Sequence, residues 1–179
     1  MTDSYGHYGY QMPSETIYKR FNYNPQSPQP HLLWLKGRRF VWCSEPDSGQ
    51  KLSMSFIKMF TGGESITARN CNSNIQQTFY PQSDMNILCN KKLECDAQDG
   101  GFLRRNCVLE YVSKFIDDKK SVDPINNIFL MDTTLDEKIN NWKYDWIRML
   151  INEYEYNIDL TTPEIVKINS KKYIDSNND

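Results

Sequence analysis

Two short apolar runs, each followed at once by polar residues, constrain the fold of this 179-residue chain more than any other feature. Residues 40–43 (FVWC) are followed by Ser44-Glu45-Pro46, and residues 85–89 (MNILC) are followed by Asn90. Runs of this length, rich in aromatic and β-branched residues and bounded by turn formers, are typical of buried β-strands. The sequence therefore predicts an α/β fold built around these strands.

Segments with the apolar spacing of a helix lie between the predicted strands and after them. Apolar residues at 52, 56, 59 and 60 predict a helix that ends at Gly62 as a left-handed cap. Residues 64–83 predict two strands joined by a hairpin tip near residues 70–74, and residues 107–112 predict a third buried strand. A capping-box pattern, Thr134 with Glu137, opens a long amphipathic helix that contains Trp142 and Trp146 as packing residues, and Thr162-Pro163 opens another.

Composition excludes several classes of protein. The formal net charge is −2, hydrophobic residues make up 39% and charged residues 25%, which is typical of a globular chain. No apolar run approaches the ~20 residues of a membrane span, and the N-terminus lacks the pattern of a signal peptide. The five cysteines form no C-x-x-C pair, which favours reduced thiols over disulfides or zinc. We expect an intracellular protein in a reducing compartment that has no membrane partner.

Two polar residues at predicted strand ends could act on a phosphate. A carboxylate such as Glu45 at the carboxyl end of a strand can orient Mg²⁺ or an attacking water. The Asn90 amide can hydrogen-bond a water or a γ-phosphate. Glu45 alone is more typical of a solvated carboxylate at a strand end, and Asn90 alone is equally typical of an ordinary turn.

Two basic segments contain glycine pairs. Lys58 and Arg69 bracket the loop with Gly62 and Gly63, where they could contact phosphates, although a capped helix followed by a hairpin explains them equally well. Arg104-Arg105 follows the turn at residues 100–101, and paired guanidinium groups there can serve as an arginine finger.

In this order, the motifs resemble the superfamily 3 helicase domain of primase–helicases from poxviruses, other large nucleocytoplasmic DNA viruses and related phages. The matching stretches are Met12-Pro13-Ser14-Glu15, residues 35–46, residues 56–69, Phe79-Tyr80-Pro81 with Asn90, and residues 99–105. The resemblance runs from about residue 9 to the C-terminus.

The resemblance implies an AAA+-like (ASCE) P-loop ATPase core that forms a ring, usually a hexamer, on single-stranded DNA. Glu45 falls on the Walker B carboxylate that acts with Mg²⁺, and Asn90 falls on the sensor asparagine. Arg104 or Arg105 falls on the arginine finger, and Arg105 is preferred because it directly precedes the next predicted strand.

The resemblance also suggests where nucleic acid would bind. Lys58, Thr67 and Arg69 fall in the motif that leads into a DNA-facing hairpin. Tyr80 and Asp84 stand where basic residues are expected, which weakens the case for DNA contact there.

The phosphate-binding loop itself is missing from the sequence. None of the eight glycines begins or completes a G-x-x-x-x-G-K-[ST] pattern, whose backbone N–H groups and Lys hold the β- and γ-phosphates. The chain alone is therefore expected not to be an active ATPase, and to use Mg-ATP only with a P-loop-bearing partner. The expected organisation is a flexible N-terminal segment (1–30), a partial ATPase core lacking its P-loop unit (31–130) and a helical C-terminal extension (131–179).

Three functions remain open from the sequence. The first is a truncated viral DNA helicase fragment related to DNA replication, located at a replication site in the host cytoplasm. The second is a non-catalytic partner or regulator that docks on an intact helicase ring. The third is an unrelated cytoplasmic α/β binding module, whose strand-end polar residues match the motifs by chance.

Overall fold

The computed structural model describes residues 2–18, 21–44, 51–91, 93–94, 105–156 and 162–176. Its strands are β1 (Gly9–Gln11), β2 (Phe40–Ser44), β3 (Ile66–Arg69), β4 (Gln76–Phe79), β5 (Asp84–Leu88), β6 (Lys114–Ile116) and β7 (Ile128–Leu130). Its α-helices are α1 (Thr2–Tyr5), α2 (Pro30–Leu33), α3 (Met54–Thr61), α5 (Leu135–Tyr156) and α6 (Glu164–Asp175). Short 3-10 helices are η1 (Gly6–Tyr8), η2 (Ser14–Ile17), η3 (Lys119–Ser121) and η4 (Pro124–Asn126).

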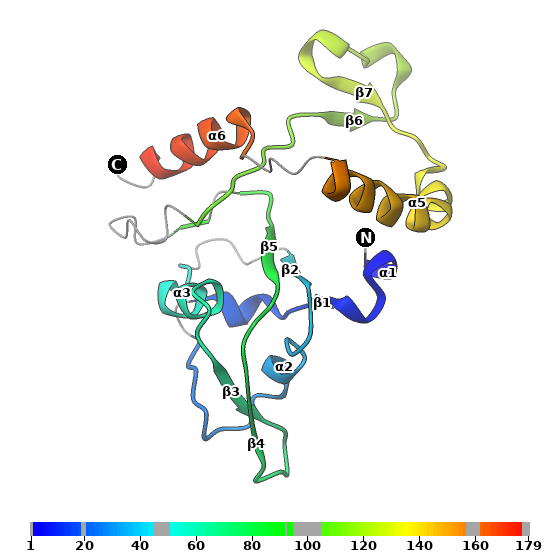
Figure 1. Ribbon diagram of the computed structural model, residues 1–179. Coiled ribbons are helices and arrows are strands. Elements are labelled where there is room, and N and C mark those ends of the chain that lie inside the picture. Colours follow the sequence, from blue (N-terminus) through cyan, green and yellow to red (C-terminus); the bar gives the residue numbers. More distant parts are fainter. Residues whose placement is uncertain are drawn as a thin grey trace.

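The central element is a parallel sheet with the strand order β1-β2-β5 (Figure 1). β2 is its middle strand, and Val41 and Cys43 on it are fully buried, as its run of apolar residues predicted. The register of β2 with β5 runs from Phe40 opposite Asp84 to Ser44 opposite Leu88, so the two strands end at the same level. Helices and mostly parallel strands confirm the α/β class expected from the sequence.

The prediction that residues 1–30 form a flexible N-terminal segment is wrong in part. Gly9–Gln11 form β1, and the ladder to β2 continues through the Met12 backbone N–H, which donates to the Trp42 carbonyl at 2.8 Å. Met12, Ile17 and Tyr18 are almost completely buried in the core. The sequence did not predict this strand, because β1 is only three residues long and lacks an apolar run. It also lies among many Gly, Pro, Gln and Tyr residues, which are typical of loops.

α3 follows the predicted helix, with Phe56 and Phe60 in the core and the Ser53 side chain accepting from the Phe56 N–H at its start. The predicted cap is wrong by one residue. Gly62 has φ −89°, in the right-handed region, and Gly63 has φ +76°, the left-handed conformation that favours glycine. The chain therefore reverses direction at the second glycine of the pair.

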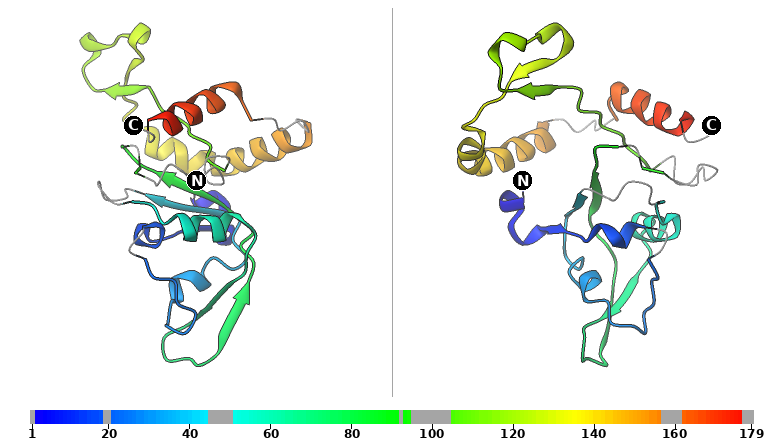
Figure 2. Two further views of the ribbon diagram at one scale, coloured as in Figure 1. Left: turned by 90° about the vertical axis from the view of Figure 1, so that its left-hand side faces the viewer. Right: turned by 180° about the vertical axis from the view of Figure 1, so that it is seen from behind.

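The β3–β4 hairpin forms as predicted, with the turn between Arg69 and Gln76. It projects at the end of the molecule opposite to β6, β7, α5 and α6 (Figures 1 and 2). Tyr23 connects the loop between η2 and α2 to this hairpin through two hydrogen bonds. Its hydroxyl accepts from the Thr67 N–H at 2.8 Å and donates to the Thr67 carbonyl at 3.1 Å.

Replacing Tyr23 by Phe is expected to destabilise the protein by about 1–3 kcal/mol, because both backbone groups of Thr67 lose this partner. Urea unfolding should show a lower midpoint with an unchanged m-value. Tyr80→Phe is the matched control, because that side chain is 66% exposed. Equal midpoints for the two variants would contradict this role of Tyr23.

The region after residue 105 differs from the prediction. The predicted strand at residues 107–112 pairs with no strand of the described part, and Leu109, Tyr111 and Val112 are exposed. The Val108 N–H donates instead to the Ser170 hydroxyl on α6 at 3.0 Å. The strands that do form here are β6 and β7, which pair with each other in parallel.

α5 begins where the sequence predicted, but its capping differs. The Thr134 hydroxyl donates to Asp132 at 2.7 Å, so Asp132 holds the residue that was expected to form a capping box with Glu137. The expected packing role of Trp142 is also wrong within this chain, since its side chain is 50% exposed. Trp146 is half-buried. α5 packs against α1 and leaves much of its apolar surface uncovered.

Candidate functional site

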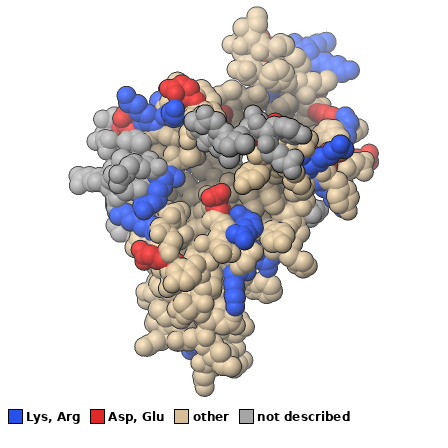
Figure 3. Space-filling model, in the orientation of Figure 1, with Lys and Arg blue, Asp and Glu red and all other residues tan. Residues whose placement is uncertain are grey.

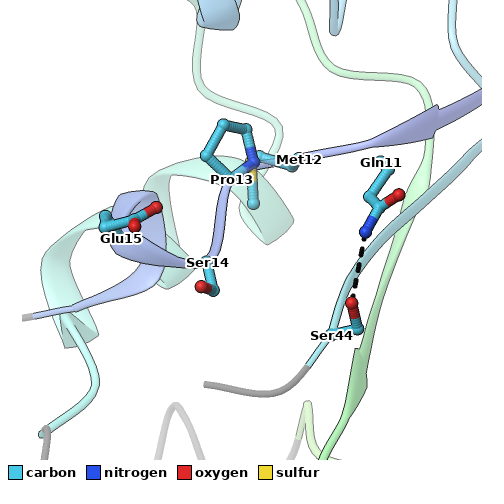
Figure 4. A pocket seen from close by; sticks show the side chains of 6 residues that line it. All are labelled: Gln11, Met12, Pro13, Ser14, Glu15 and Ser44. Carbon is cyan, nitrogen blue, oxygen red and sulfur yellow. Dashed lines mark hydrogen bonds between the residues drawn. The ribbon is translucent and has the colours of Figure 1, made fainter. Parts of the chain in front are cut away.

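The carboxyl-terminal edge of the β1-β2-β5 sheet forms a polar hollow of about 350 Å³. It is lined by Gln11, Met12, Pro13, Ser14, Glu15 and Ser44 (Figure 4). Gln11 ends β1, Ser44 ends β2, and the Gln11 amide donates to the Ser44 hydroxyl at 3.2 Å. In sheets of parallel strands, ligands bind at this edge, because side chains and loops from several strands converge there.

η2 supplies the other polar groups of the hollow. Pro13 ends the extended segment, and the 3-10 turn that follows places Ser14 and Glu15 beside the ends of β1 and β2 (Figure 4). The hydroxyl, amide and carboxylate groups offer both donors and acceptors, and oxygen ligands of this kind suit Mg²⁺. The hollow could therefore hold a polar ligand.

The two predicted strand-end residues follow neighbouring strands. Asn90 lies two residues beyond the end of β5 and is exposed. Glu45 directly follows Ser44 in the sequence and lies outside the described residues. Because β2 and β5 are parallel neighbours that end at the same level, the segments that leave them start at one edge.

The predicted nucleic-acid residues make structural contacts. The Arg69 guanidinium donates to the Gln26 carbonyl and to the Ser73 carbonyl, each at 3.0 Å, and so closes the hairpin turn. The hydroxyls of Thr67 and Thr78 lie 2.8 Å apart across the hairpin. Lys58 is half-buried in the last turn of α3. The contacts of Thr67 and Arg69 explain the conformations of these two residues without a ligand.

The tip of the hairpin and β4 lack the positive charge that phosphate binding requires. Residues 70–79 contain no Lys or Arg. On the face shown in Figure 3, charges of both signs are mixed, and no continuous basic surface covers the hairpin. Since phosphate neutralisation dominates nucleic-acid affinity, this face offers little electrostatic attraction for DNA.

The arginine pair is only partly described. Arg105 is exposed in a turn, whereas Arg104 and the glycines at 100 and 101 lie outside the described residues. Arg105 is not among the described residues that line the hollow.

The thiol beside the sheet edge is chemically inert. Burial raises the pKa of Cys43 to about 12, with a smaller contribution from nearby Cys89. Cys43 therefore stays protonated at neutral pH and is a core residue of β2. Within the described ranges, no group of three or more His, Cys, Asp or Glu side chains is arranged to hold a metal ion. None of the helices in these ranges is long and apolar enough to span a bilayer.

Sequence pattern alone did not reveal that Gln11, Ser14 and Ser44 line one hollow. One signal in the sequence pointed to Ser14 and Ser44. Both Met12-Pro13-Ser14-Glu15 and the segment that contains Ser44 belong to the stretches that resemble the family. Their convergence depends on β1 pairing with β2 over a separation of about thirty residues, and a three-residue strand gives no periodicity that would reveal it.

Comparison with known proteins gives one informative match. The chain is 32% identical over 136 residues to "Putative helicase L207/L206" of Acanthamoeba polyphaga mimivirus. The match covers 72% of this chain and 14% of the mimivirus protein, so the chain spans about one seventh of that relative. No protein-family model matches the chain. The similarity supports a relation between this chain and a helicase-related viral family.

Proposed function

We propose that this chain provides part of the ATPase core of a superfamily 3 DNA helicase that acts in viral DNA replication. In this role Glu45 activates the attacking water with Mg²⁺, Asn90 senses the γ-phosphate, and Arg105 acts on the nucleotide of a neighbouring subunit. The phosphate-binding loop comes from outside these 179 residues, so the chain does not hydrolyse ATP alone.

The observation that carries the proposal is the alignment of β2 and β5. They are parallel neighbours in register up to Ser44 and Leu88, and each is followed within two residues by a group suited to phosphate chemistry. The polar hollow at the same edge supplies further hydrogen-bonding groups from Gln11 and Glu15. The 32% identity to a protein named as a helicase supports the same assignment.

β5 also leaves an open edge where another strand could add. It is the last strand in the order β1-β2-β5, and within the described residues its outer side pairs with no strand. Its side chains are half-buried or exposed, whereas parallel strands are normally covered on both faces. A further parallel strand carrying the phosphate-binding loop would cover this edge.

The test uses a chimera in which this chain replaces the corresponding stretch of the mimivirus protein. Single-stranded DNA-stimulated ATP hydrolysis is measured for the chimera, with the parental mimivirus protein as the reference. The proposal expects turnover within about tenfold of the parent, because the transferred residues perform the same chemistry. A folded chimera that binds ATP but has no turnover, beside an active parent, would contradict it.

A further inference from the structure

α5 has two neighbouring apolar faces, and its own chain covers only one of them. Trp146, Ile147 and Leu150 are half-buried and mark the face that packs on the rest of the molecule. Ile147 and Leu150 are spaced by three, as expected for one side of a helix. The second face lies about a sixth to a quarter of a turn away and shares Trp146 with the first.

The second face is a seam of residues with heptad spacing. The seam consists of Leu135, Ile139, Trp142, Trp146 and Met149, separated alternately by four and three residues. Leu135, Ile139, Trp142 and Met149 are between 43% and 50% exposed, although each is a large apolar side chain. A four–three alternation is the pattern by which one helix packs against another along its length, with Ile139 and Trp146 at a positions.

Charged residues beside the seam indicate what binds there and in which direction the two helices run. Lys138 and Asp145 directly precede the two a positions and are exposed, on the side of the seam away from the half-buried face. In an antiparallel pair of α5 helices, Ile139 stacks on Trp142 of the second copy, which brings Lys138 beside Asp145 of that copy. Because such a dimer has twofold symmetry, the contact between Lys138 and Asp145 occurs twice.

A parallel pair is disfavoured by the same charges. It would place Lys138 beside Lys143 of the second copy, a like-charge contact that also occurs twice. The pattern therefore favours antiparallel self-association over parallel.

We propose that the seam of α5 is a homodimer interface, in which two copies of this chain pair through antiparallel α5 helices. The seam spans about 21 Å, or two heptads, which is short for a coiled coil. We therefore expect a reversible dimer with a dissociation constant on the order of 1–100 µM. The proposal does not depend on ATP chemistry.

Sedimentation equilibrium of the full chain, at concentrations up to the ~100 µM range, tests the interface. The wild-type chain should show a monomer–dimer equilibrium. Lys138→Glu should weaken dimerisation about tenfold or more at low salt, because the introduced carboxylate would face Asp145 of the second copy. Asp145→Lys should weaken it similarly, by setting two ammonium groups together.

Mixing the two variants gives the decisive result. The heterodimer of Lys138→Glu with Asp145→Lys restores opposite charges at both contacts, so the mixture should dimerise more tightly than either variant alone. Asp132→Asn is the matched control. It removes the ion pair that Lys138 makes within its own chain, at 2.5 Å, and should not weaken dimerisation, because it leaves Lys138 free to pair with Asp145 of the second copy.

Each other outcome overturns the proposal. A wild-type chain that stays monomeric throughout this range has no such interface. Tighter dimerisation of Lys138→Glu alone would indicate parallel helices, since the introduced carboxylate would then face Lys143 of the second copy. A dimer that is indifferent to all three variants, with circular dichroism showing intact helices, would place the contact elsewhere on the molecule.

Discussion

Replacing Glu45 by Gln in the mimivirus chimera is expected to lower ATP turnover by about 10²- to 10⁴-fold while ATP still binds. The amide keeps the size of the side chain but loses the negative charge that orients the attacking water and Mg²⁺. Steady-state ATP hydrolysis measures the turnover, and fluorescent-nucleotide titration measures the affinity. A loss of turnover without loss of affinity indicates a group that acts in the transition state.

Glu64→Gln is the matched control for this variant. Glu64 is an exposed carboxylate in the loop between α3 and β3, and its neutralisation makes the same change in net charge. Turnover of the Glu64→Gln chimera should equal that of the unmodified chimera. Equal turnover for Glu45→Gln as well would remove Glu45 from the mechanism.

Arg105→Ala is the second large effect that we expect, a loss of about 10³-fold or more in turnover, as for an arginine finger. Arg105 is exposed, so the substitution should not unfold the chain. Arg104→Ala distinguishes the two neighbouring arginines, because only the finger should show the full loss. Arg105→Lys should restore little, since an ammonium lacks the planar fork that grips a phosphate.

Subunit mixing separates an arginine finger from a residue that acts within its own subunit. In a mixed assembly, an Arg105→Ala subunit supplies an intact Glu45, and its Glu45→Gln neighbour supplies an intact Arg105. Combining the two inactive chimeras should therefore recover a measurable part of the ATPase rate. A mixture as inactive as its components would show that Arg105 does not act across a subunit boundary.

Local pattern predicted the central strands and the hairpin well, because burial leaves a direct signature in the sequence. The run that became β2 is apolar where its side chains enter the core, and the Asn-rich tip between β3 and β4 suits a turn. The run that became β5 also forms a strand, but its side chains are only half-buried or exposed. The pairing of β1 with β2 left no such signature. It depends on contacts between distant segments, which periodicity within a window does not record.

Apolar periodicity was misleading at residues 107–112 and in α5. The same apolar residues that suggested a buried strand and a packed helix are exposed at Tyr111 and Trp142. A pattern of side chains shows that a face can be buried, but not which molecule buries it. In α5 the sequence thus predicted the helix correctly, but Trp142 on its apolar face is left half-exposed by this chain.

The candidate site could be predicted only in outline. Asn90 follows β5, as the strand prediction required, whereas Gln11 became part of the site through β1, which the sequence did not reveal. Thr67 and Arg69 were selected for their chemistry, but their side chains close the hairpin. Hydrogen bonds of this kind are decided by the register of the two strands, to which residue type is only a weak guide.

We expect the nucleotide site to need a phosphate-binding loop from outside these 179 residues. Titration of the isolated chain with Mg-ATP, followed by isothermal calorimetry, measures whether the chain binds the nucleotide without that loop. We expect no saturable binding into the millimolar range, because Glu45 and Asn90 act on a nucleotide that other groups hold. Saturable binding of Mg-ATP by the isolated chain would contradict this expectation.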